Sequence, residues 1–121
     1  MTRTGKRKKY YQTLKSTISS QTYQDIRHIK SNDNPNCTYL SNEEDVYRVE
    51  KDKSLGKAFY NVYLNEIGSK VTDGWVLILD DDCKLTDNTF IERLADKCSN
   101  ASENEILIFQ SGIFPQKARY C

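Results

Sequence analysis

The sequence predicts an α/β domain with an open, mostly parallel sheet and flanking helices. Segments with helical and strand-like patterns alternate along the 121 residues, and such alternation favours parallel strands joined by right-handed crossovers. Residues 75–79 form a short, continuous apolar run, as a parallel strand buried on both faces does. The length suits one hydrophobic core, so residues 1–121 are expected to form a single domain.

The N-terminal half contributes one predicted helix and one predicted strand. Residues 9–20 carry an apolar side chain at every fourth position, which predicts an amphipathic helix. Its stripe consists of Tyr10, Leu14 and Ile18. Residues 25–30 predict a short strand followed by a turn rich in Asn and Asp, and residues 38–55 are expected to be irregular. Because Met1 stands where a first strand would end, that strand is expected to be missing.

The C-terminal half predicts two more helices and a last strand. Residues 57–70 show helical spacing, and Thr86 or Asp87 can cap another helix after residues 75–79. The spaced positions of the first helix are Phe59, Val62, Tyr63, Glu66 and Ile67, and those expected to face inward in the second are Phe90, Ile91, Leu94 and Cys98. Residues 105–110 predict the last strand.

Composition and targeting signals narrow the class of protein. The net charge is +1, and no apolar run approaches the roughly 20 residues that cross a bilayer, so no transmembrane segment is expected. The N-terminus is charged but has no apolar stretch after it, which argues against a signal peptide. Free thiols in a reducing cytoplasm are expected, because the four cysteines show neither a CxxC pair nor zinc spacing. They are Cys37, Cys83, Cys98 and Cys121.

The first fifteen residues carry a run of cations with no acid among them. The run consists of Arg3, Lys6, Arg7, Lys8, Lys9 and Lys15. Its simple interpretation is a solvated face, and its functional interpretation is an anion site. The near-neutral charge of the chain and the lack of a basic–aromatic surface pattern argue against a nucleic-acid partner.

Three consecutive carboxylates follow the apolar run. If the backbone stays extended, Asp80 and Asp82 point to one side and Asp81 to the other. Two carboxylates on one side can hold Mg²⁺ or Mn²⁺, with waters and substrate phosphates as the remaining ligands. The plain alternative is a solvated acidic loop before a helix.

Three polar segments are expected at one edge of the sheet. Residues 2–9, 31–36 and 80–83 supply a basic loop, an Asn/Asp turn and the acidic triplet. In open parallel sheets, ligands bind outside the carboxyl ends of the strands. Together these segments could hold a nucleotide diphosphate and a divalent cation.

These pieces occur in the order and spacing of a known family. The chain resembles the GT-A fold nucleotide-diphospho-sugar transferases, particularly the family 2-like glycosyltransferases, over roughly residues 2–95. The matching motifs are residues 16–23 (Ser-Thr-Ile-Ser-Ser-Gln-Thr-Tyr), the turn 32–34 (Asn-Asp-Asn) and residues 74–83, which end in the acidic triplet and a cysteine. The resemblance implies an enzyme that transfers a sugar from a nucleotide-diphosphate donor to the hydroxyl of an acceptor that the sequence does not identify.

The resemblance also implies roles for individual residues. Thr2 and Thr4 would lie against the nucleotide, and Asp33 would accept hydrogen bonds from its base. Asp80 would lie near the ribose and the metal, and Asp82 would bind the metal on the diphosphate. The cofactor would be Mn²⁺ or Mg²⁺, acting as a Lewis acid on the departing diphosphate.

The chain departs from the family pattern in three places. Asn32 replaces an acid, and Cys83 stands where a fourth Asp is common. Eleven residues follow Gln110, so the acceptor-binding half and the usual place of the catalytic base are missing. The expectation is therefore a truncated or split transferase that keeps its nucleotide-binding half.

Two other functional classes remain open. A non-catalytic α/β module, receiver-like or a degenerate transferase remnant, could use the same carboxylates as an acidic metal-binding pocket. Nucleic-acid binding through the basic N-terminus is the weaker alternative. The single histidine, His28, lies within a predicted strand and is interpreted as structural.

Overall fold

The computed structural model describes residues 1–49, 54, 59–102 and 104–105, and it has an α/β fold with an open, three-stranded parallel sheet. This confirms the coarse prediction of an α/β fold with an open parallel sheet and flanking helices. The strands are β1 (Thr2–Thr4), β2 (Lys30–Asn32) and β3 (Val46–Arg48), and the helices are α1 (Lys8–Ser19), α2 (Phe59–Gly68) and α3 (Phe90–Ser99).

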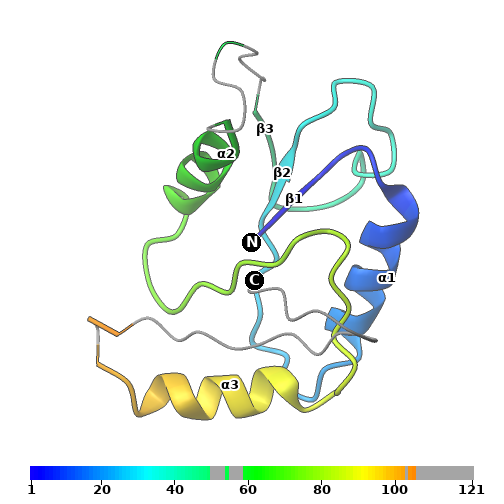
Figure 1. The fold of residues 1–121 in the computed structure, drawn as a ribbon. Coiled ribbons are helices and arrows are strands. Elements are labelled where there is room, and N and C mark those ends of the chain that lie inside the picture. The colour runs from blue at the N-terminus through cyan, green and yellow to red at the C-terminus, as the bar shows by residue number, and fades with distance from the viewer. Residues whose placement is uncertain (50–53, 55–58, 103, 106–121) are drawn as a thin grey trace, which may run out of the picture.

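The sheet lies between two helices, with α1 on one face and α2 on the other, and α3 lies at the amino end of the strands (Figure 1). The parallel register pairs Thr2 with Lys30 and Lys30 with Val46. Because alternate side chains of a strand point to opposite faces, Arg3 points toward α2. Its guanidinium carbon lies 5.6 Å from the ring centre of Tyr63.

Residues 77–79 lie beside the other edge of β1. The Met1 nitrogen donates to the carbonyl oxygen of Leu77 (2.6 Å), and the Leu79 nitrogen donates to that of Met1 (3.0 Å). This is the hydrogen-bond pattern of a parallel pair. Thr2, the next residue, turns its N–H toward β2 instead. The order across the sheet is therefore residues 77–79, β1, β2, β3.

Two strand predictions are wrong in the central part of the sheet. The first strand, expected to be missing, is present as β1. Residues 75–79 do not form a regular strand, because within the described part of the chain their ladder hydrogen bonds are made only with Met1, the residue before β1. As whole residues, Trp75, Val76 and Ile78 are 46%, 43% and 46% exposed, although the prediction placed them in a core.

The remaining strand predictions differ in position. The predicted strand 25–30 overlaps β2 only at Lys30. β2 begins there because Lys30 is the residue that pairs with Thr2, the start of β1. β3 lies inside the stretch 38–55 that was expected to be irregular. Its β-prone Val46 and Tyr47 follow three consecutive acids, so the local strand signal is weak. The predicted strand 105–110 lies almost entirely outside the described residues.

The first two helices confirm the predicted segments and supply most of the buried hydrophobic side chains among the described residues. Each buries an aromatic and an aliphatic side chain, about one helical turn apart, against the sheet. These residues are Tyr11 and Leu14 in α1 and Tyr63 and Ile67 in α2, each at most 1% exposed. Tyr10, predicted to face inward, is 58% exposed, because its neighbour Tyr11 takes the core position.

The start of α3 is fixed by a side chain from outside the helix. Gln21 is 3% exposed; its Oε1 accepts a hydrogen bond from the Ile91 nitrogen (3.0 Å), and its Nε2 donates to the Asp87 carbonyl oxygen (2.9 Å). α3 begins after Thr89, later than the predicted caps, and Asp87 instead closes the preceding turn by accepting from the Thr89 nitrogen. This gives a physical reason for the glutamine in the Ser-Gln-Thr-Tyr stretch.

We expect Gln21→Leu to lower the free energy of unfolding by about 2 kcal/mol. The substitution removes the external cap of α3 and leaves the Ile91 N–H without its partner. Urea unfolding followed by circular dichroism measures the change. Gln12→Leu is the matched control, because Gln12 is exposed on α1, and its effect should stay within about 0.5 kcal/mol. Equal effects of the two substitutions would contradict the capping role.

Two further sequence predictions concern membranes and thiols. Within the described part of the chain, no helix is long and apolar enough to cross a membrane. Among the described residues, Cys37, Cys83 and Cys98 form no disulfide, and Cys121 lies outside the described residues. The four inward positions of α3 are only partly buried, so α3 adds no fully buried side chain to the core.

Candidate functional site

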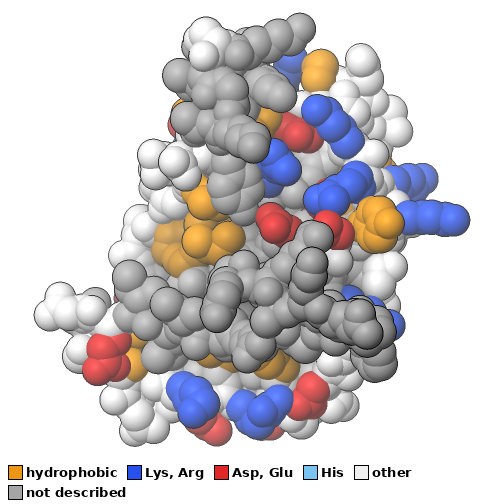
Figure 2. Space-filling view, viewed as in Figure 1, with side chains coloured by type: hydrophobic (Ala, Val, Ile, Leu, Met, Phe, Trp, Pro, Cys, Tyr) orange, Lys and Arg blue, Asp and Glu red, His pale blue; other side chains and the backbone are white. Residues whose placement is uncertain are grey.

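Loops from three places in the chain meet at the carboxyl edge of the sheet. The turn after β1 carries Lys6 and Arg7, the turn after β2 carries Asp33, and the segment after residues 77–79 carries the acidic triplet. Lys6 and Arg7 each form an ion pair with one of the acidic loops. Figure 2 shows acidic and basic side chains side by side on this part of the surface.

The guanidinium of Arg7 bridges two carboxylates of the triplet. Its Nη1 donates to Asp82 Oδ2 (2.9 Å), and its Nη2 donates to Asp81 Oδ1. The two partners differ in exposure, since the Asp81 side chain is 4% exposed and that of Asp82 is 47% exposed. Burial lowers the pKa of Arg7, but the hydrogen bonds and charges of the two carboxylates outweigh it, so the pKa lies above its ordinary value.

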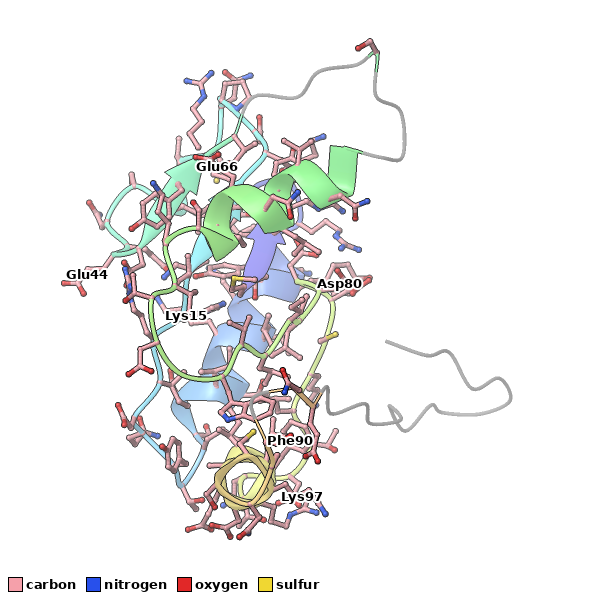
Figure 3. All side chains as sticks on the ribbon, turned by 90° about the vertical axis from the view of Figure 1, so that its left-hand side faces the viewer. Lys15, Glu44, Glu66, Asp80, Phe90 and Lys97 are labelled. Carbon is pink, nitrogen blue, oxygen red and sulfur yellow. The ribbon has the colours of Figure 1, made fainter. Side chains whose placement is uncertain are left out.

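The triplet does not have the extended alternation that was predicted. The Cys83 nitrogen donates to the Asp80 carbonyl oxygen (3.0 Å), which closes a turn at Asp81 and Asp82. The turn lets these two neighbours reach the same guanidinium, although Asp81 is buried between two exposed carboxylates. Asp80 lies near the sheet, far from Phe90 and Lys97 of α3 (Figure 3).

Carboxylate oxygens are suitable ligands for a hard divalent cation, but too few of them lie together in the described part of the chain to hold one alone. Among the described residues, no three His, Cys, Asp or Glu side chains come close enough together to hold a metal ion. Mg²⁺ is commonly bound by one or two carboxylates, with waters and substrate phosphates completing the shell. Asp80 and Asp82, both exposed, could therefore serve only with oxygens from a bound diphosphate.

Asp33 is a mostly buried carboxylate, and one of its two oxygens accepts no hydrogen bond from the described residues. Its side chain is 11% exposed, and its Oδ2 lies 3.8 Å from the Lys6 Nζ. Its Oδ1 is buried and has no hydrogen-bond partner among the described residues. Asp33 Oδ1 lies close to the backbone of Gly5, and only glycine leaves room for it there. The φ of Gly5 is +140°, and a Cβ at this position would lie 2.7 Å from Asp33 Oδ1.

The hydroxyls of Thr2 and Thr4 are used inside the protein. Both residues are buried, at 1% and 2% exposure. The Thr2 hydroxyl is hydrogen-bonded to His28 Nε2 (2.9 Å), and the Thr4 hydroxyl to the Tyr39 hydroxyl (2.9 Å). Tyr39 also accepts from the Gly5 nitrogen (2.8 Å), so it fixes the start of the basic turn.

A charged cluster lies behind these threonines, on the face covered by α1. Glu43 accepts from the Tyr11 hydroxyl and pairs with Lys15 (2.6 Å) and Lys30 (3.5 Å). Burial opposes ionisation of Glu43, but the hydrogen bonds from Lys15 and Tyr11 lower its pKa below the ordinary value. Through Glu43, the cluster links Lys15 of α1 to Lys30 of β2, and it thereby fixes α1 against the sheet beneath the carboxyl edge.

Sequence patterns predicted one of the two residues that shape this edge only in part and missed the other. Arg7 belonged to the basic run interpreted as a possible anion site, but its pairing with residues more than seventy positions away leaves no local signal. Tyr39 lies in a loop, and no motif marks it. Of the predicted site residues, the structure brings Asp33 and Asp82 to the same edge through the adjacent Lys6 and Arg7.

Comparison with known proteins does not assign this chain to a family. No protein-family model, no curated protein and no solved structure matches it. The resemblance to the GT-A transferases therefore stays a prediction, and the function has to be inferred from the residues at the carboxyl edge.

Proposed function

We propose that the chain binds a nucleotide-diphosphate sugar at the carboxyl edge of its sheet, as the nucleotide-binding half of a GT-A-like glycosyltransferase. The observation that carries the proposal is the meeting of Asp33, the acidic triplet and two basic side chains from three separate loops. The complete reaction would transfer the sugar to an acceptor hydroxyl, with the catalytic base and the acceptor unassigned.

The strand order supports this location. β1 has β2 and β3 on one side and residues 77–79 on the other, so the direction in which strands are added reverses after β3. Ligands of open α/β sheets bind in the crevice at such a reversal, outside the carboxyl ends of the strands. The loops that follow β1 and residues 77–79 are the two joined by Arg7.

Each residue at the edge has a role in this proposal. Asp33 Oδ1, buried without a partner among the described residues, would accept an N–H donor of the nucleotide base. Asp80 and Asp82 would hold Mn²⁺ or Mg²⁺, which when bound neutralises charge on the departing diphosphate. Thr2 and Thr4 would act indirectly, because their hydroxyls are bonded to His28 and Tyr39.

A second candidate is a non-catalytic α/β module with the same acidic edge. It is favoured by the Arg7 guanidinium, which already supplies a counter-charge to Asp81 and Asp82 without any ligand. The cytoplasmic location expected from the sequence stays a prediction.

A thermal unfolding screen tests the donor site. We expect Mn²⁺ with a nucleoside diphosphate to raise Tm by roughly 10 °C at a ligand concentration about 100 times Kd, and each alone to raise it less. Asp82→Ala should abolish the gain from combining them, whereas Asp96→Ala, an exposed carboxylate on α3, should not. If UDP, GDP, ADP and CDP with metal all leave Tm unchanged, the proposal is wrong.

A further inference from the structure

The two carboxylates on Arg7 form unequal ion pairs. Asp81 is buried, so separating it from Arg7 would leave a carboxylate in the protein interior without its cation. Asp82 is half exposed and can be hydrated when Arg7 leaves it, and exposed ion pairs of this kind contribute little to stability. The Arg7–Asp81 pair is therefore the fixed contact, and the Arg7–Asp82 pair is the exchangeable one.

The fixed contact leaves much of the guanidinium available. Arginine has five N–H donors, and within the described part of the chain the structure uses one on Asp81 and one on Asp82. The Arg7 side chain is 40% exposed at the surface, above the ring of Tyr10 at 5.8 Å. Guanidinium groups bind phosphate oxygens in a bidentate way, which requires a pair of adjacent N–H groups facing the ligand.

The surroundings of Arg7 also favour an anion. Lys6 and Lys8 flank it in sequence, and both are exposed. α1 begins directly after Arg7, has no acid in its first turn, and receives no side-chain cap at Arg7. The positive end of the helix dipole thus adds to the charge of the side chains.

We propose that Arg7, oriented by Asp81, binds the diphosphate of the donor, and that the diphosphate displaces Asp82 from the guanidinium. Asp81 is then a positioning residue, and Asp82 competes with the ligand. The inference rests on the proposed function for the identity of the ligand. The exchange also frees the Asp82 carboxylate when the anion arrives, so a divalent cation and the diphosphate should each strengthen binding of the other.

The first test is calorimetric titration of the full chain with inorganic pyrophosphate, without divalent cation. Arg7→Gln should weaken binding at least tenfold, because it removes charge-assisted hydrogen bonds to phosphate. Lys9→Gln removes the same charge from an exposed residue of the first turn of α1 and should change Kd less than twofold. Equal losses for the two variants, or no binding to the wild-type chain, would overturn the proposal.

The second test predicts a gain of affinity from losing a carboxylate. Asp82→Asn should tighten metal-free pyrophosphate binding about two- to fivefold, the amount expected from removing an exposed competing ion pair. The same variant should lose the further tightening that Mg²⁺ gives the wild-type chain. Asp96→Asn should change neither value. Weaker metal-free binding by Asp82→Asn would show that Asp82 does not compete with the anion.

The third test separates positioning from general stability. In wild-type protein, nitrogen-15 spectra should show separate Arg7 guanidinium N–H signals, because the pair with Asp81 hinders rotation of the group. Pyrophosphate should shift these signals, and Asp81→Asn should merge them and weaken binding while Gln12→Leu leaves both unchanged. If Asp81→Asn does not fold, the Arg7→Gln and Asp82→Asn results decide the proposal.

The outcomes also distinguish this inference from the proposed function. Pyrophosphate binding that depends on Arg7, without any Tm gain from nucleoside diphosphates, supports the anion site and contradicts the nucleotide donor. A nucleoside diphosphate that binds with metal and is insensitive to Arg7→Gln supports the donor site and overturns the role of Arg7.

Discussion

Replacing Arg7 with methionine is expected to lower the free energy of unfolding by about 3 kcal/mol at pH 7. The substitution keeps the apolar part of the side chain and removes the cation from Asp81, whose side chain is 4% exposed. Breaking a buried ion pair by removing one partner costs about 3–5 kcal/mol, because a buried charge is left uncompensated. The lower figure applies here, since Arg7 itself is 40% exposed. Urea unfolding at fixed ionic strength measures the change.

The double substitution distinguishes an unpaired charge from lost packing. Arg7→Met with Asp81→Leu removes both charges, and replacing a buried pair by apolar side chains is often neutral. We therefore expect the double variant to recover at least half of the loss. Lys9→Met, at an exposed position two residues further on, should stay within about 0.5 kcal/mol of wild type. A double variant no more stable than Arg7→Met would contradict this explanation.

A large loss of stability is also expected as the pH falls from 6.5 toward 4. Burial and the nearby charge of Lys30 lower the pKa of His28 from 6.5 to about 4. In this window the unfolded chain binds a proton at His28 and the folded chain does not, so acid favours unfolding. The pKa difference corresponds to about 3 kcal/mol, which is fully present above pH 6.5 and is lost as the pH falls through the window.

The comparison between wild type and His28→Gln isolates this contribution. Glutamine can keep a hydrogen bond to the Thr2 hydroxyl, because its amide group reaches about as far as the imidazole Nε2. The free energy of unfolding of the variant should be nearly flat between pH 6.5 and about 4.5. Glu43, whose pKa is lowered from 4.5, contributes its own acid sensitivity below that range. Parallel pH profiles of the two proteins would exclude His28 as the cause.

The helices were predictable because their signal is local. The apolar spacing within residues 9–20 and 57–70 places α1 and α2 close to their observed bounds. The strands were harder, because each regular strand is three residues long and takes its limits from the neighbour. β2 begins at Lys30 only because that residue faces Thr2, and no local pattern contains this information.

The candidate site was predictable in its location but not in its contacts. The carboxyl edge follows from the alternation of elements, and Asp33 and the acidic triplet were assigned to it from their positions after strands. The charge balance was not predictable, because Arg7 reaches the triplet across the fold and a turn at Asp81 replaces the assumed extended backbone. The glutamine of the Ser-Gln-Thr-Tyr stretch was noticed without a reason, and its reason is the distant start of α3.

The pairing of Arg7 with Asp81 has a consequence for the kinetics of folding. The partners are 74 residues apart in sequence, and the parallel ladders between them join strands that are also distant along the chain. Contacts of such long range are made only after the entropy of closing large loops has been lost. We therefore expect the pair of Arg7 with Asp81 to form late in folding, and the acidic triplet to lack this cation until then.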